Sequence, residues 1–118
     1  MDLCDGARVR RALERHPRMA WRIFTEGEAA LCQRRKDPAP CFAARFAAKE
    51  AALKALGTGW SSGISWRDVE VVRLPEGPPG VVFHGKALER FGALGAVRAH
   101  LTLTHEGDLA AAVVILET

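Results

Sequence analysis

Apolar positions recur with a helical period in the first half of the chain and follow strand patterns in the second half. The clearest helix is predicted over residues 41–56, which are rich in alanine and leucine and precede Gly57, a favourable C-terminal cap. At about 100° per residue, one side of this helix carries an apolar stripe made of Phe42, Phe46, Leu53 and Leu56. Lys49 falls inside the stripe and Glu50 at its edge. A lysine on a buried face is unfavourable unless it is paired or functional.

Two shorter helices are predicted before this one. The first covers residues 7–16, where Pro17 ends the helical pattern. The second covers residues 26–35, because Thr25 and Glu28 have the spacing of a capping box. In that motif each of the two side chains bonds to the other residue's backbone amide, which fixes where the helix begins.

The second half of the chain has the pattern of strands joined by turns. Strands are predicted over residues 69–72, 81–84, 97–104 and 109–116, with a short helix over 86–94. The last strand is apolar at nearly every position, so we expect both of its faces to be covered. These elements predict an α+β fold, in which residues 1–118 form one domain of helices packed on a small antiparallel sheet.

Composition is that of a soluble globular protein. Of 118 residues, 48% are hydrophobic and 26% are charged, and no apolar run is long enough to cross a membrane. The N-terminus lacks a signal-peptide pattern, so we expect a cytoplasmic protein with no membrane association. The cysteines, Cys4, Cys32 and Cys41, lack zinc-site spacing and are expected to be reduced thiols.

The net charge of +3 is distributed unevenly. One stretch is crowded with arginines, with Glu14 as the only acidic residue among them: Arg8, Arg10, Arg11, Arg15, Arg18 and Arg22. This stretch indicates either a docking face for an acidic partner or a solvated basic surface. No helix-turn-helix or RNA-binding signature accompanies it, so nucleic-acid binding is not expected.

Residues 45–59 read R-F-A-A-K-E-A-A-L-K-A-L-G-T-G and carry most of the candidate chemistry. Glu50 and Lys54 are adjacent on the helix at a spacing of four residues, as are Arg45 and Lys49. The Gly-x-Gly after the helix allows a ligand to approach the backbone closely. Ordinary surface ion pairs on a helix would produce the same charge spacing.

This segment closely resembles the R-F-A-A-K-E-A-x-x-K-A-x-G-T-G signature of the bacterial holo-acyl-carrier-protein synthases, which are 4′-phosphopantetheinyl transferases. Asp2-Leu3 is similar to the near-N-terminal aspartate motif of that family, and residues 101–105, L-T-L-T-H, resemble its penultimate strand. The resemblance implies that the 4′-phosphopantetheine group of coenzyme A is transferred to a serine of an acidic acyl carrier protein. Adenosine 3′,5′-bisphosphate is the implied leaving group.

The resemblance also implies roles for individual residues. It gives Asp2 and Glu50 as ligands of Mg²⁺, an ion that prefers hard oxygen donors. The implied catalytic residues are Glu50, Lys54 and His105. The implied coenzyme A site contains Arg45, Lys49, Lys54, Gly57, Gly59 and His105. The implied carrier-binding residues are Arg8, Arg15 and Arg18.

Several alternatives stay open at this point. Lys49 is either a phosphate ligand or a structural partner, and either Glu50 or a metal-bound water accepts the proton of the attacking serine. The carrier belongs to fatty-acid synthesis or to a polyketide or multienzyme synthase. A relative that binds coenzyme A or a carrier without transfer is the alternative function.

The resemblance further implies a homotrimer with sites between neighbouring subunits, which is compatible with Trp60 or Trp66 in or near a loop. Only Met1 precedes Asp2, whereas the family has several residues there, so we expect Asp2 to be loosely held and to bind magnesium weakly. Gly6 also stands where the family prefers a larger residue.

Overall fold

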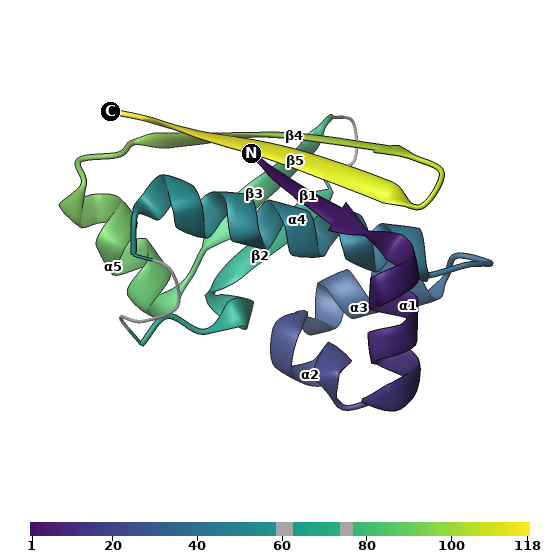
Figure 1. The fold of residues 1–118 in the computed structure, drawn as a ribbon. Helices are drawn as coiled ribbons and strands as arrows, with labels where there is room; N and C mark the ends of the chain where they lie inside the picture. The colour runs from purple at the N-terminus through teal and green to yellow at the C-terminus, as the bar shows by residue number, and fades with distance from the viewer. Residues whose placement is uncertain (59–62, 74–76) are drawn as a thin grey trace.

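The computed structural model describes residues 1–58, 63–73 and 77–118. Its elements are β1 (Asp2–Asp5), α1 (Gly6–Arg15), α2 (Met19–Ile23), α3 (Glu26–Gln33), α4 (Ala39–Leu56), η1 (Trp66–Asp68), β2 (Val69–Arg73), β3 (Pro79–Phe83), α5 (Gly85–Ala93), β4 (Arg98–Glu106) and β5 (Leu109–Glu117). The long helix α4 lies beneath a three-stranded sheet, with α1, α2 and α3 gathered at one end and α5 at the other (Figure 1). No helix in these described ranges is long and apolar enough to cross a membrane.

Helix α4 is the centre of the core. Its buried residues occupy almost every side of the helix, and both apolar clusters of the domain include residues from it. The helix ends at Gly57, whose φ of 76° lies in the left-handed region and whose amide bonds to the carbonyl of Leu53 at 3.0 Å. The predicted helix, its cap and the α+β class are confirmed.

The strands form two antiparallel sheets rather than the single sheet that the sequence predicts. One sheet has the order β1-β5-β4, and the other is the hairpin of β2 and β3. Strands β3 and β4 pack against each other without a shared ladder of hydrogen bonds. Strand patterns alone carry no information on which strands pair, so this division is visible only in the structure.

The expectation that both faces of the last strand are covered is wrong for the single chain. In β5, Ala110, Ala112 and Val114 are buried, and α4 packs against this strand. Leu109 and Ile115 point to the opposite face of the strand and are 52% and 58% exposed. Strand β5 therefore has one buried face and one apolar face that is substantially open in the isolated chain.

Strand β1 is paired along its length with β5, a contact that the expectation of a loosely held Asp2 did not include. Its four residues pair with β5 from Asp2 opposite Ala112 to Asp5 opposite Leu109. The structure also explains Gly6, whose amide donates to the carbonyl of Asp108 at 2.5 Å. A Cβ atom at Gly6 would lie 2.9 Å from that oxygen, so the turn between β4 and β5 excludes a larger residue.

A disulfide joins Cys32 at the end of α3 to Cys41 at the start of α4, with Cα atoms 5.3 Å apart. The expectation of three reduced thiols is therefore wrong for these two, and Cys4 alone among the three is free. The short segment between the helices turns back on itself and brings the two cysteines together. Spacing rules for metal sites and redox motifs do not anticipate such a pair.

Candidate active site

The exposed end of α4 lies beside the start of β1 and brings Asp2 to Lys54. The Lys54 ammonium is 2.6 Å from Asp2 Oδ1 and donates more weakly to the carbonyl of Met1 at 3.4 Å. The hydrogen bond and the charge of Asp2 raise the pKa of Lys54, and the charge of Glu50 contributes in the same direction. Both predicted metal ligands therefore act electrostatically on one ammonium group.

The free thiol of Cys4 lies in the same region. Its pKa is raised, mainly by burial. The negative charges of Asp2 and Asp5 raise it further, and Glu50 has a smaller effect in the same direction. Glu50 is thus on the side of α4 that faces β1. Asp2 and Glu50, which are far apart in the sequence, are brought to one neighbourhood by the pairing of β1 with the sheet above α4.

The donor groups in this neighbourhood suit magnesium better than a transition metal. Asp2 and Glu50 offer carboxylate oxygens, and Mg²⁺ commonly binds through one or two carboxylates while retaining water. Among the described residues, no group of three or more histidine, cysteine, aspartate or glutamate side chains is arranged to hold a metal. A closed zinc site is therefore not formed there. In this structure the positive charge paired with Asp2 is the Lys54 ammonium.

A second site is a basic pocket of about 520 Å³ that is lined by the first half of α4. Basic and acidic residues from three segments line it together with a histidine from a fourth: Arg35, Lys36, Asp37, Arg45, Arg73 and His105. Asp37 is the only acidic residue among the described lining residues, so the pocket is suited to a multiply charged anion. The structure brings the predicted residues Arg45 and His105 together here.

Arg45 is nearly enclosed, with only 4% of the residue exposed. Its pKa is lowered, mainly by burial. The neighbouring positive charges of Arg35 and Arg73 lower the pKa further, whereas the negative charge of Glu28 raises it. The sequence prediction missed Arg35, Lys36 and Arg73. The basic run at residues 34–36 was a weak signal for the first two, and no sequence signal marked Arg73.

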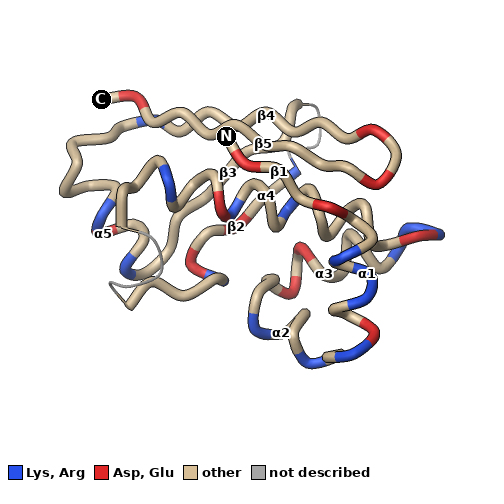
Figure 2. Tube along the Cα trace, in the orientation of Figure 1, with Lys and Arg blue, Asp and Glu red and all other residues tan. Residues whose placement is uncertain are grey.

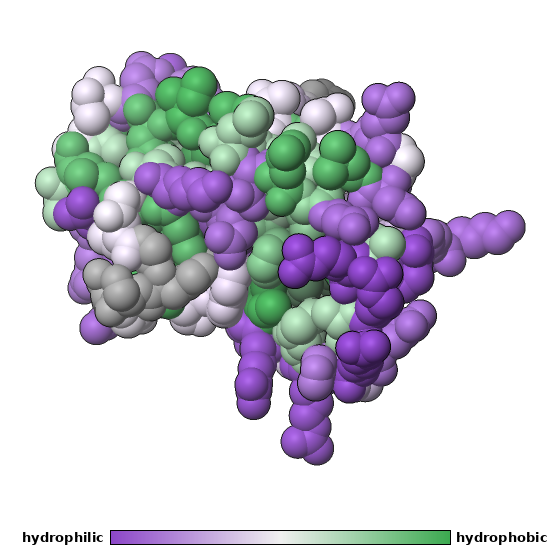
Figure 3. Space-filling view, viewed as in Figure 1, coloured by the Kyte–Doolittle hydropathy of each residue, from purple (hydrophilic) through white to green (hydrophobic). Residues whose placement is uncertain are grey.

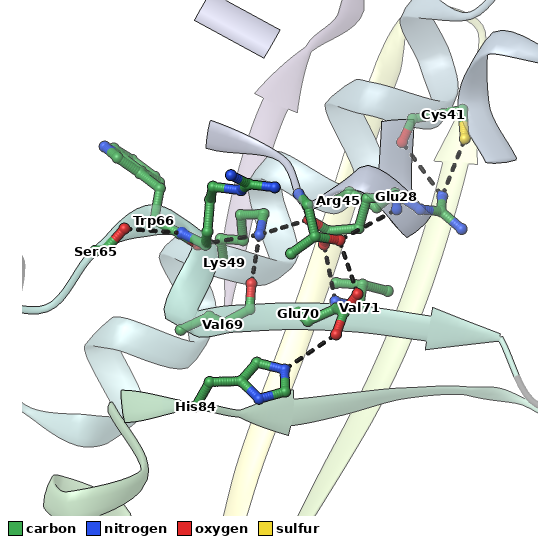
Figure 4. A network of polar contacts seen from close by, with 12 residues as sticks. Glu28, Cys41, Arg45, Lys49, Ser65, Trp66, Val69, Glu70, Val71 and His84 are labelled. Atoms are coloured by element: carbon green, nitrogen blue, oxygen red, sulfur yellow. Dashed lines mark hydrogen bonds and ion pairs between the residues drawn. The ribbon is translucent and has the colours of Figure 1, made fainter. Parts of the chain in front are cut away.

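Lys49 lies in the core, which corrects the expectation that it contacts coenzyme A. Its side chain is 0% exposed, and its ammonium is 2.8 Å from Glu28 Oε1. The ammonium also donates to the carbonyls of Trp66, at 3.1 Å, and Val69 (Figure 4). These three acceptors use all the donors that an ammonium group has. Of the two alternatives for Lys49, the structure supports the structural one.

Glu28 completes this buried network. Its carboxylate accepts from the amides of Thr25 and Val71, each at 2.8 Å, in addition to Lys49. The capping box predicted for α3 is present, and the same carboxylate that caps the helix also holds β2 and α4. The network therefore fixes the helix that carries Glu50 against the rest of the domain.

The glycines after α4 are only partly described. Gly57 is exposed and caps the helix. Gly59 and Trp60 lie outside the described residues, so their predicted roles stay predictions. Trp66 stacks on Phe46 with ring centroids 5.2 Å apart, so this tryptophan packs within its own domain.

The predicted carrier-binding arginines are all exposed, on α1 and the turn to α2. Basic residues gather at this end of the molecule, where hydrophilic side chains project outward (Figures 2 and 3). Arg15, Arg18 and Arg22 line a pocket of about 570 Å³. Arg10 differs, because it bonds to Asp37 at 2.8 Å. The sequence did not predict α2, which orients Arg22 and the 62% exposed Trp21.

Known proteins resemble this chain over nearly its whole length. The family model described as the 4′-phosphopantetheinyl transferase superfamily matches residues 1–114. A holo-(acyl-carrier-protein) synthase of Methylobacterium radiotolerans is 51% identical, covering 98% of this chain and 89% of that protein. One of Syntrophotalea carbinolica is also 51% identical, with 98% and 91% covered.

Solved structures agree with the sequence relatives. The holo-(acyl-carrier-protein) synthase of Neisseria meningitidis has a TM-score of 0.86 at 32% identity, with 99% of this chain and 94% of that chain covered. The Helicobacter pylori enzyme in complex with coenzyme A has a TM-score of 0.85 at 25% identity, covering 98% and 96%.

Proposed function

The chain belongs to the 4′-phosphopantetheinyl transferase superfamily, and we propose that it works through a magnesium centre at Asp2 and Glu50. It is an enzyme that transfers the 4′-phosphopantetheine group of coenzyme A to a serine of apo-acyl carrier protein. This agrees with the family's description and with relatives that are holo-(acyl-carrier-protein) synthases, one of them in complex with coenzyme A. The observation that carries the proposed centre is the contact between Asp2 and Lys54 beside Glu50.

The reaction forms a bond between the serine oxygen and the β-phosphorus of coenzyme A and breaks the pyrophosphate bond. The serine proton is lost, and adenosine 3′,5′-bisphosphate leaves. Bound magnesium would neutralise negative charge on the pyrophosphate oxygens. Lys54 lies one helical turn beyond Glu50 and is 60% exposed, so its ammonium can leave Asp2 and contact a phosphate.

The basic pocket is the proposed site for the nucleotide end of coenzyme A. Arg45 and His105 line it, and the surplus of positive charge suits the phosphates of this substrate. The proposed magnesium centre and the pocket use opposite ends of α4: Lys54 lies in its last turn and Arg45 nearer its start. Gly57 and Gly59 are proposed to approach the substrate after the helix ends.

Release of adenosine 3′,5′-bisphosphate tests whether the carrier serine is the acceptor. The chain is incubated with coenzyme A, magnesium and apo-carrier, and the released nucleotide is quantified by chromatography. We expect one nucleotide for each carrier modified. A carrier with its acceptor serine replaced by alanine should release none, and equal release with that carrier would identify water or another group as the acceptor.

The Lys54 ammonium and a magnesium ion would compete for Asp2, so Lys54→Met should tighten magnesium binding in the absence of coenzyme A. We expect at least about a fivefold lower dissociation constant, because a full positive charge beside the site is removed. Transfer should nevertheless fall, because the phosphates lose a cation. Titration calorimetry with MgCl₂ measures the affinity, and Lys86→Met is the matched control. An unchanged affinity would place magnesium away from Asp2.

Arg8, Arg15 and Arg18 are proposed to dock the acidic carrier. Rim charges act mainly on association rate and salt dependence. The double variant Arg8→Ala with Arg15→Ala should therefore raise the KM for the carrier and flatten its dependence on salt, with the KM for coenzyme A nearly constant. Steady-state kinetics at several salt concentrations measure both constants. Equal rises in the two KM values would place these arginines at the nucleotide instead.

We also propose a homotrimer with active sites between neighbouring subunits, acting in the cytoplasm on the carrier of fatty-acid synthesis. The exposed apolar face of the sheet, with Leu3 at 58%, Leu109 and Ile115, supports burial against other copies of the chain. Sedimentation equilibrium tests the assembly. Ile115→Glu should release monomers, and a monomeric parent protein would contradict the proposal.

A further inference from the structure

The disulfide between Cys32 and Cys41 lies next to the proposed coenzyme A pocket. Cys32 is completely buried between α3 and α4, whereas Cys41 is partly exposed and lines the pocket beside Arg45. One covalent bond therefore connects the helical core to the wall of the pocket. The transfer chemistry itself makes no use of either cysteine.

Cys41 also holds the guanidinium of Arg45. Nη1 of Arg45 donates to the Cys41 carbonyl at 3.3 Å and to the Cys41 sulfur at 3.2 Å (Figure 4). Nε of Arg45 is buried and has no hydrogen-bond partner within the described residues. A guanidinium has five N–H donors, and the contacts to Cys41 are those that set its direction here. The position of the sulfur thus bears directly on where Arg45 points.

The charges around Arg45 do not fix its position, unlike the hydrogen bonds to Cys41. Arg35 and Arg73 repel its charge, and burial disfavours the charged form, as the lowered pKa of Arg45 reflects. Glu28 favours the charge, but its carboxylate is already bonded to Lys49 and to the amides of Thr25 and Val71. An anion in the pocket would offset the repulsion, provided that Arg45 points toward it.

We propose that the Cys32–Cys41 disulfide positions Arg45, so that reduction of this bond weakens the binding of coenzyme A. This inference rests on the proposed role of Arg45 in the coenzyme A pocket. Without the bond, the Cys41 side chain can rotate and its thiol gains a proton. The segment 33–40, which carries Arg35 and Lys36 into the pocket wall, also loses the constraint that closes it.

Reduction takes two electrons and two protons from a dithiol, which becomes a disulfide. The attacking thiolate bonds to the accessible Cys41 sulfur, and Cys32 leaves as a thiolate that takes up a proton. The second thiol of the reductant then displaces Cys41, which leaves as a thiolate and is also protonated. In a reducing compartment, disulfides are usually transient or redox-sensing, so the pair would link coenzyme A affinity to the supply of dithiol.

Calorimetric titration of coenzyme A into the oxidised and dithiothreitol-reduced protein tests this proposal. Both samples carry Cys4→Ser, so that the free thiol near Asp2 does not contribute to the difference. Thiol titration should detect none in the oxidised sample and two in the reduced one, as the single disulfide requires. We expect reduction to weaken coenzyme A binding by at least about fivefold, at the low end of coupling between linked sites.

Kinetics separate positioning from a general structural effect. Reduction should raise the KM for coenzyme A while the KM for the carrier stays constant. In an Arg45→Gln background, reduction should lower coenzyme A affinity less than in the parent protein, because only the effect through Arg35 and Lys36 remains. An equal effect of reduction in both backgrounds would contradict the positioning of Arg45 by the disulfide. If Arg45→Gln itself leaves that affinity unchanged, the proposed pocket is wrong.

Three other results would overturn only the disulfide proposal. One is weakened binding in Arg45→Gln together with equal affinities of the oxidised and reduced parent protein. Another is the detection of two thiols before reductant is added. The third is a reduced chain that is unfolded at every temperature where the oxidised chain is folded. The disulfide would then be required for the folding of the whole domain and not for the position of Arg45 alone.

Discussion

Replacement of Glu50 by glutamine should lower the rate of transfer at least about a hundredfold while the chain stays folded. Glutamine keeps the size of the side chain and removes its charge, so it offers a cation only a neutral amide oxygen. Loss of one electrostatic stabiliser of a reaction typically has an effect of this order. Glu50 is only partly buried, so the substitution leaves the packing of α4 largely intact.

Initial rates of carrier modification at saturating coenzyme A and carrier measure this effect, with circular dichroism as the check on folding. Glu89→Gln, an exposed substitution on α5, is the matched control and should be fully active. Calorimetry should also show weaker magnesium binding in Glu50→Gln. A folded Glu50→Gln variant with near-normal rate at saturating magnesium would remove Glu50 from the proposed metal site.

Replacement of Lys49 by methionine should have the largest effect on stability. The substitution leaves the carboxylate of Glu28, which is 0% exposed, without its charged partner. Removing one member of a buried ion pair typically costs about 3–5 kcal/mol of unfolding free energy. We expect a loss of about 3 kcal/mol, because the amides of Thr25 and Val71 still bond to Glu28.

Urea denaturation followed by circular dichroism measures the loss, and the double variant Lys49→Met with Glu28→Gln is the informative comparison. It should recover part of the stability, because no buried charge remains without a partner. A loss below about 1 kcal/mol in the single variant would mean that water reaches the Glu28 carboxylate. A loss of affinity for coenzyme A in the folded variant would mean that Lys49 belongs to the coenzyme A site.

Local signals predicted α1, α3, α4 and α5, but not α2, and they predicted part of the site. The capping box of Thr25 and Glu28 and the cap at Gly57 involve residues close in sequence, and both are present. Lys49 inside an apolar stripe indicated a paired or functional lysine, and the structure supplies Glu28 as the partner. The sequence could not identify that partner, because the pairing depends on how α3 packs against α4.

Features that depend on tertiary packing were not predicted. Asp2 pairs with Ala112, far along the chain, and the residues next to Asp2 in the sequence gave no sign of this pairing. The disulfide depends on the turn that brings Cys41 back to Cys32. The open face of β5 was misread because an apolar strand has the same pattern whether its own domain or another copy of the chain covers it.

The mass of an apo-acyl carrier protein after incubation with this chain tests the central claim most directly. With coenzyme A and magnesium, the carrier should gain the mass of one phosphopantetheine group, located on a single serine. The increase should disappear when EDTA replaces magnesium and return when magnesium is added in excess. A carrier of unchanged mass under all three conditions would contradict transfer, and full modification in EDTA would contradict the metal centre at Asp2 and Glu50.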